Sequence, residues 1–203
     1  MGGYIGAVTT TRPVIAANRR GKREQIIDAA KQVLARDGLA ACTARSVAEA
    51  SPLTKSAVHY YFDDIHELID LAMREHVAAM AMALRGAAGA ETDPAEKVWA
   101  VVDAYLRMFA EQPNAAFLWF EYWIDTGRRN SSEAVGATLG DMHVLLHEVL
   151  AELPVADAAA TAHTVLSWLL GTVVQQQVQP KTPASLREEV TVILRSTTSP
   201  RTK

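Results

Sequence analysis

The stretch Thr43–Tyr61 reads TARSVAEASPLTKSAVHYY, and it determines how the rest of the chain is interpreted. Threonine is a favoured N-cap residue, because its side-chain oxygen accepts a hydrogen bond from a free backbone N–H of the first helical turn. Thr43 and Thr54 therefore predict two short helices, over residues 44–50 and 55–61. Two short helices joined by a tight turn are typical of a helix-turn-helix.

A longer helix is expected before this stretch, over residues 22–37, and Gly38 provides a residue that can end it in the left-handed conformation. Its apolar face consists of Ile26, Ala30, Val33 and Leu34. The helix expected over 55–61 is also two-sided. Its packing face holds Ala57, Val58 and Tyr61, and its outward face holds Lys55, Ser56, His59 and Tyr60. The outward side chains can all bond to phosphates or base edges.

The charge distribution is uneven. Residues 1–60 hold nine Lys or Arg against four Asp or Glu, whereas residues 61–203 hold eleven against nineteen. A basic head on an acidic body indicates that the head meets a polyanion. The single cysteine, Cys42, excludes an internal disulfide and suits a reducing cytoplasm. No apolar run approaches the ~20 residues of a membrane span, so we expect a cytoplasmic protein without a membrane partner.

Six further helices are expected after residue 63, and no segment alternates as a strand would. They define an all-α chain: a three-helix, homeodomain-like head on a six-helix body. The expected parts are a flexible basic arm over 1–18, a DNA-binding domain over 19–63 and an effector-binding and dimerisation domain over 64–198. The start and stop signals are Asp64 with Glu67, Gly86 and Gly89, Asp93-Pro94, Asn114, Asn130 with Glu133, Pro154, Gln179 and Thr182-Pro183.

From Arg23 to Leu68 the chain resembles the amino-terminal domain of the TetR family of regulators. That resemblance implies a homodimer whose heads bind a palindromic double-stranded DNA operator and whose bodies bind a small-molecule effector. The matching pieces are Ile26-Ile27-Asp28-Ala29-Ala30, Gly38, Thr43, Val47-Ala48-Glu49-Ala50, Leu53-Thr54-Lys55-Ser56-Ala57-Val58-His59-Tyr60-Tyr61-Phe62 and Glu67-Leu68.

The resemblance also indicates which residues contact DNA. They are Thr43, Arg45, Thr54, Lys55, Ser56, His59 and Tyr60. Two positions depart from the family pattern. Pro52 stands where glycine is usual, so the turn must be built differently. Ile65, followed by His66, stands where a phosphate-binding lysine is usual. DNA binding is therefore expected to depend more on Lys22, Arg19 and Arg20.

Aromatic residues crowd the expected sixth helix between Phe117 and Trp123, so this helix must be buried on all sides or border a cavity or a partner. Core packing explains most of them, but the resemblance places an effector pocket in this region. The expected ligand-binding residues are Trp99, Tyr105, Met108, Phe109, Phe117, Phe120, Trp123, Met142, His143 and Trp168. His143 and His147 have a spacing that zinc could use, but polar anchoring or core packing is favoured over a metal site.

The sequence shows no nucleophile paired with a base, no phosphate-binding loop and no catalytic carboxylate pair, so neither an enzyme nor a cofactor is expected. We expect a repressor that dimerises through its eighth and ninth helices and leaves its operator when an amphipathic ligand binds. The stripes assigned to the dimer are Val165, Leu166, Leu169, Val173, Val174, Leu186, Val190, Ile193 and Leu194. An activator, a constitutive DNA binder and an all-helical binding protein that does not read DNA remain alternatives.

Overall fold

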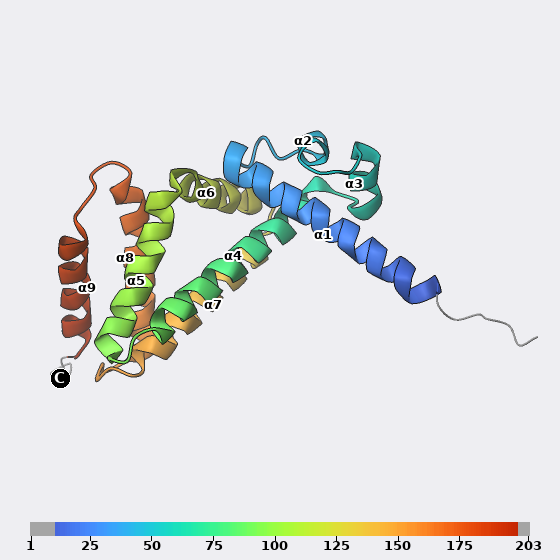
Figure 1. Cartoon of the computed structure of the whole chain (residues 1–203). Helices are drawn as coiled ribbons and strands as arrows, with labels where there is room; N and C mark the ends of the chain where they lie inside the picture. The colour runs from blue at the N-terminus through green and yellow to red at the C-terminus, as the bar shows by residue number, and fades with distance from the viewer. Residues whose placement is uncertain (1–10, 199–203) are drawn as a thin grey trace, which may run out of the picture. The chain divides into compact units, whose positions relative to one another are not determined.

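The computed structural model describes residues 11–198, which form an all-α chain without strands. The described residues divide between Met73 and Arg74 into two compact units, called here the head and the body. The helices, labelled in Figure 1, are α1 (Thr11–Asp37), α2 (Ala44–Glu49), α3 (Lys55–Tyr61), α4 (Ile65–Gly89), α5 (Pro94–Glu111), α6 (Pro113–Arg128), α7 (Glu133–Leu150), α8 (Ala158–Gln176) and α9 (Pro183–Thr198).

The head packs α2 against both α1 and α3 (Figure 1). The predicted apolar face of α1 is buried, and so are Val47 of α2 and Val58 of α3. Gly38 has φ 82° and its N–H donates to the Leu34 carbonyl at 3.1 Å, which confirms the expected left-handed stop. The head's apolar core therefore fixes the orientation of α3 relative to α1.

The start of α1 corrects the expected arm. The helix begins at Thr11, so residues 11–18 are helical, while residues 1–10 lie outside the described part of the chain. Pro13 lies in the first turn, where a helix tolerates proline because the first N–H groups have no intrahelical partner. The head also includes the first turns of α4, so the boundary follows Met73 instead of residue 63.

Four helix boundaries differ from expectation. Helix α4 continues through Gly86 to Gly89. Helix α6 begins at Pro113, one residue before Asn114, and Asn130 ends it with φ 53° instead of capping α7. Asparagine tolerates this left-handed conformation better than most residues, so the same residue type serves either end of a helix. Helix α8 begins after its cap residue Asp157 and ends at Gln176.

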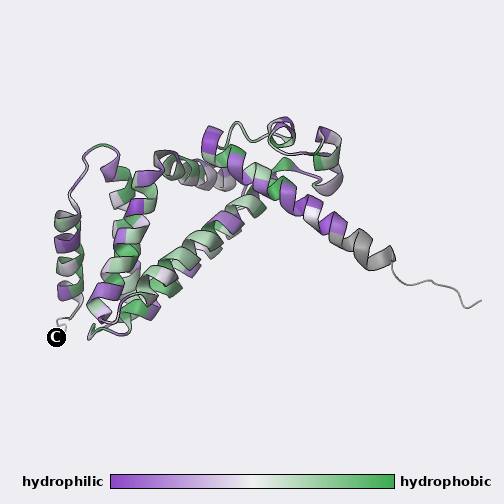
Figure 2. Cartoon of the chain, viewed as in Figure 1, coloured by the Kyte–Doolittle hydropathy of each residue, from purple (hydrophilic) through white to green (hydrophobic). Residues whose placement is uncertain are grey.

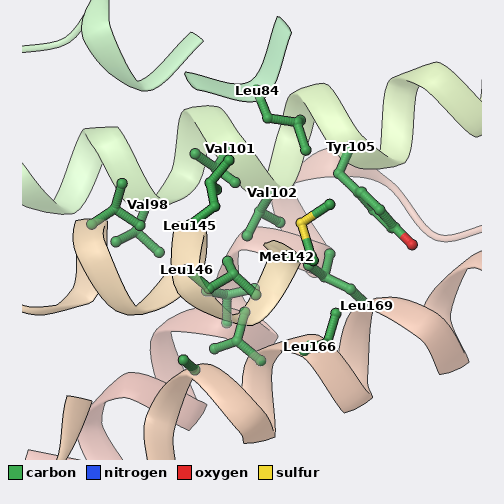
Figure 3. Close-up of a cluster of buried hydrophobic side chains, with 14 of the residues drawn as sticks. Leu84, Val98, Val101, Val102, Tyr105, Met142, Leu145, Leu146, Leu166 and Leu169 are labelled. Carbon is green, nitrogen blue, oxygen red and sulfur yellow. The ribbon is translucent and has the colours of Figure 1, made fainter. Parts of the chain in front are cut away.

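The core of the body is formed by α5, α7 and α8, with contributions from α4 and α9. Figure 3 shows Val101, Met142 and Leu169 among the side chains that interdigitate there. Helix α9 is held at its edge by polar contacts. Arg187 pairs with Glu96 and lies 5.4 Å above the Trp99 ring. Trp168 Nε1 donates to Glu189 Oε2 at 3.1 Å.

These contacts correct the predicted dimer stripes. Val165, Leu166, Leu169, Val173, Leu186 and Val190 are all buried within their own chain, and Ile193 and Leu194 pack against the same core. Of the predicted set, Val174 is exposed, at 47%. An amphipathic stripe shows only that a face is covered, and here the covering helices belong to the same chain.

Two glycine-to-alanine substitutions test these backbone assignments with opposite signs. Gly38→Ala adds a side chain at positive φ and is expected to destabilise the protein by about 1–2 kcal/mol. Gly86→Ala lies in the interior of α4, where an added Cβ meets nothing within 4 Å. It is expected to stabilise by about 0.5–1 kcal/mol. Thermal unfolding of both variants is the measurement, and a stabilised Gly38→Ala protein would contradict the left-handed stop.

Candidate functional site

The outward face of α3 is fixed by the caps of α2 and α3. Thr43 Oγ1 accepts from the N–H of Ser46 at 3.2 Å, and Ser46 Oγ accepts from the N–H of Thr43 at 2.9 Å, which completes a capping box. Thr54 Oγ1 accepts from the N–H of Ala57 at 3.3 Å. Both threonines are exposed, as predicted, and the structure shows that they also set where each helix begins.

The turn between α2 and α3 shows how the chain accommodates Pro52. Ser51 Oγ accepts from the N–H of Leu53 at 3.1 Å and lies 3.3 Å from the Ala48 carbonyl, to which it donates. The serine side chain thus satisfies a backbone donor next to the proline, which has no N–H of its own. Pro52 is therefore accommodated within the turn itself, and α2 and α3 are still joined as a helix-turn-helix.

All seven residues predicted to contact DNA lie exposed in the head. Several of them border an open groove of about 370 Å³ between the start of α2, α3 and the segment that leads into α4. The groove is lined by Cys42, Thr43, Ala44, Arg45, Lys55, Val58, His59, Phe62, Asp63, Asp64 and Ile65. Cations and hydroxyls therefore converge at one surface, and Asp63 and Asp64 add negative charge on its far side.

Arg45 and Lys55 differ in their partners. The Arg45 guanidinium Nε donates to Glu49 Oε1 at 2.9 Å, one helical turn away on α2. Lys55 makes no ion pair within residues 18–197 and is free to meet a phosphate. The Arg45–Glu49 pair is predictable from its i,i+4 spacing. It is also weak, because both side chains are mostly exposed.

Cys42 lies beside this groove but is buried. Burial raises the pKa of its thiol to about 11, so the thiol stays protonated near neutral pH. Since the thiolate is the reactive form, Cys42 has the character of a packing residue at the base of α2.

Two cation–ring contacts in the head were not predicted. The guanidinium of Arg19 lies 5.4 Å from the centroid of Tyr60, and that of Arg23 lies 4.8 Å from the centroid of Phe62. The apolar pattern gave no signal for the Arg19 contact, because the helix was expected to begin after that residue. Purple bands along α1 in Figure 2 mark the polar side chains of this helix.

The ten predicted ligand-binding residues are placed in four different environments. Tyr105, Phe109 and Met142 are buried in the core of the body, and Met108 and Phe120 pack against it. Trp99 and Trp168 contact charged residues of α9. Phe117 and Trp123 are exposed on α6, at 58% and 51%. His143 Nε2 lies 3.1 Å from the Ala159 carbonyl.

Tyr105 is the buried member of this set that carries a side-chain hydroxyl. The residue is 4% exposed, and its hydroxyl oxygen keeps contact with solvent and makes no hydrogen bond to a described residue. Burial raises the pKa of this phenol, which therefore stays neutral at physiological pH. Figure 3 shows the hydroxyl directed away from Val101 and Leu145, at the edge of the apolar cluster.

Comparison with known proteins gives a family match in the head. Residues 26–72 match the model of the family described as "Bacterial regulatory proteins, tetR family". The HTH-type transcriptional regulator BetI of Paraburkholderia phytofirmans is 32% identical over 111 residues, which cover 53% of this chain and 56% of that protein. BetI of Stenotrophomonas maltophilia is 30% identical over 103 residues, which are 50% of this chain and 53% of that protein. The chain thus matches about half the length of these curated relatives.

Solved structures share the fold over most of the chain. The fatty acid degradation regulator FadR from Bacillus halodurans is similar with a TM-score of 0.67 at 20% identity, over 85% of this chain and 94% of that one. The multidrug binding protein EbrR complexed with proflavin gives a TM-score of 0.67 at 21% identity, over 85% and 99%. At such identities the likeness establishes the all-helical fold of head and body. None of the described helices is long and apolar enough to cross a membrane.

Proposed function

Through residues 26–72 this chain belongs to the tetR family of bacterial regulatory proteins, and we propose that it is a dimeric, ligand-controlled DNA-binding repressor. The observation that carries the proposal is the outward face of the helix-turn-helix. Arg45, Lys55, Ser56, His59 and Tyr60 are all exposed there, and their helices are fixed by the head's buried core.

The proposed division of work on DNA follows from side-chain chemistry. Arg45 offers a planar fork that matches the O6 and N7 acceptors of guanine, so it is assigned to base reading. Lys55 and Tyr60 are assigned to phosphates, which position the head without reading sequence. Thr43, Thr54, Ser56 and His59 complete the contact surface.

A second copy of the chain is proposed to cover the outer face of α8. From Ala158 to Gln176 this helix contains no Asp, Glu, Lys or Arg, although one side of it is exposed. A helix face without charge that remains open to solvent is typical of the core of a protein–protein interface. The face consists of Ala160, His163, Thr164, Ser167, Gly171 and Val174, continues to Val178 beyond the helix, and is joined by Val192 of α9.

The effector is proposed to be a largely apolar, neutral molecule that bonds to the Tyr105 hydroxyl. Among the described residues of the body, the buried side chains include no charged group, and their polar members are threonines and the tyrosines Tyr105 and Tyr122. An ionised ligand would lose its hydration there without a compensating charge, which costs several kcal/mol. EbrR, which shares the fold, is a multidrug binding protein.

Tyr105→Phe tests this anchor. The substitution removes a hydroxyl that has no partner in the described chain, so the melting temperature is expected to stay the same or rise. Effector affinity is expected to fall by about 0.5–1.5 kcal/mol, the usual contribution of one hydrogen bond. Titration of intrinsic tryptophan fluorescence with an aromatic or lipophilic metabolite found by screening measures it. Tyr61→Phe, in the head, is the control, and equal affinity in both variants would refute the anchor.

Helix α4 is proposed to carry the signal, because it runs without interruption from the head at Ile65 into the body at Arg74–Gly89. A ligand that binds one body conformation more tightly shifts the population of head arrangements, and the coupling is reciprocal. A coupling of about 1–3 kcal/mol weakens DNA binding from several-fold to about a hundredfold.

A gel shift with DNA from upstream of the chain's own gene, at increasing salt, tests the function directly. A regulator is expected to retard this DNA with an affinity that falls steeply as salt rises. If the compound that changes the tryptophan fluorescence also releases the DNA, the result supports a ligand-controlled repressor. Retarded DNA that no bound compound releases favours a constitutive binder, and the absence of any shift favours a protein that does not read DNA.

A further inference from the structure

Arg19 lies on α1, outside the helix-turn-helix, and yet contacts its exposed face. Its guanidinium carbon is 5.4 Å from the centroid of the Tyr60 ring, whose side chain is 66% exposed. A guanidinium within about 6 Å of an aromatic centroid is attracted to the face of the ring. The contact therefore connects α1 with a side chain of α3 that is proposed to meet DNA.

The ring of Tyr60 is held from two sides. Tyr61 packs against it edge-on, with centroids 5.1 Å apart and an interplanar angle of 89°. Arg19 contacts it as well. An exposed tyrosine without such neighbours samples several rotamers and loses that freedom when it binds, which weakens binding. Two neighbours that restrict the ring in the free protein reduce this loss.

Arg19 also retains its hydrogen-bonding capacity. On the same helix, Arg20 pairs with Glu24 at 3.0 Å, and Arg23 lies 3.7 Å from Glu67. Arg19 has no carboxylate partner within residues 18–197. Stacking uses the flat face of a guanidinium and leaves its N–H groups, which lie in the plane, free to donate to a phosphate.

We propose that Arg19 is a positioning residue that holds the Tyr60 ring in place for DNA, and that it donates to the DNA backbone beside that ring. Helix α1 thereby adds a contact to the surface formed by α2 and α3. This inference rests on the proposed function as a DNA-binding protein. Its distinguishing feature is coupling: the contribution of Arg19 to affinity depends on the ring of Tyr60 and is independent of the phenolic hydroxyl.

A double-mutant cycle tests the coupling in the full chain, with fluorescence anisotropy on a mixed-sequence DNA duplex at several salt concentrations. Arg19→Ala is expected to weaken binding and to lower the salt slope by about 0.9, the value for one phosphate contact. In a Tyr60→Ala background its effect is expected to be about two- to fivefold smaller, which corresponds to an exposed cation–ring contact. In a Tyr60→Phe background, which keeps the ring, the full effect is expected.

Arg20→Ala is the matched control, because Arg20 is a neighbouring, exposed arginine that pairs with Glu24 on its own helix. It is expected to cause the same loss with or without the Tyr60 ring. Equal losses for Arg19→Ala in all three backgrounds would overturn the positioning role and leave DNA binding intact. A wild-type chain without salt-dependent affinity for the duplex would instead refute the proposed function. Unchanged melting temperatures separate a role on DNA from a role in folding.

Discussion

Replacing Arg45 with alanine is expected to cost about 1–3 kcal/mol in affinity for the preferred operator and to relax the base preference at one position of each half-site. Arg45 is exposed at the start of α2, with its guanidinium held by Glu49. Because that pair is exposed, exchanging the carboxylate for a guanine edge costs little. Most of the free energy of the proposed Arg45–guanine contact is therefore available to favour guanine over the other bases.

Comparing Arg45→Ala with Lys55→Ala distinguishes a contact to a base from a contact to a phosphate. Lys55 is an exposed cation of α3 with no ion pair in the described chain, and it is assigned to a phosphate. Its loss is expected to weaken binding to all sequences alike and to lower the salt slope by about 0.9. Selection from a randomised duplex pool, repeated with each variant, measures both effects. If Arg45→Ala selects the wild-type operator with undiminished preference, Arg45 does not read bases.

Local signals in the sequence predicted most of the head. Thr43, Thr54 and Gly38 act at the positions where their cap and stop chemistry placed them. These predictions succeeded because a helix cap depends on a few adjacent atoms. The start of α1 was missed because residues 1–18 were assigned to a flexible arm, although Pro13 is compatible with a first helical turn. Once α1 begins at Thr11, Arg19 is helical, and its reach to Tyr60 depends on packing that local signals do not contain.

Predictions about the body failed where they required the identity of a neighbour. The apolar stripes of α8 and α9 were read correctly as covered faces, but Leu169 and Val190 are covered by their own chain. Phe117 and Trp123 of α6 were among the residues expected to line a pocket, and both are exposed in the single chain. Periodicity reports that a face is apolar, but it does not report what covers that face. The proposed interface on α8 rests instead on the absence of charge from the exposed side of this helix.

That uncharged outer face leads to the second large effect. Val174→Asp is expected to convert the proposed dimer to a monomer, because it places a carboxylate in the proposed desolvated contact between two copies of α8. Val174 is 47% exposed in the single chain, so the substitution leaves the chain's own core intact. A monomer holds one half-site at a time. Operator affinity is therefore expected to fall by about a hundredfold or more, the usual loss when two linked sites are separated.

Val144→Asp is the matched control, since Val144 is 49% exposed and belongs to α7, a different helix from the one that carries the uncharged face. The same carboxylate is placed there at nearly the same exposure, and the protein is expected to remain a dimer with wild-type operator affinity. Sedimentation velocity at micromolar concentration and operator binding measure both variants. If Val174→Asp remains a dimer, a different face joins the two chains. If both variants dissociate, the dimer responds to added negative charge in general, and the assignment of α8 is refuted.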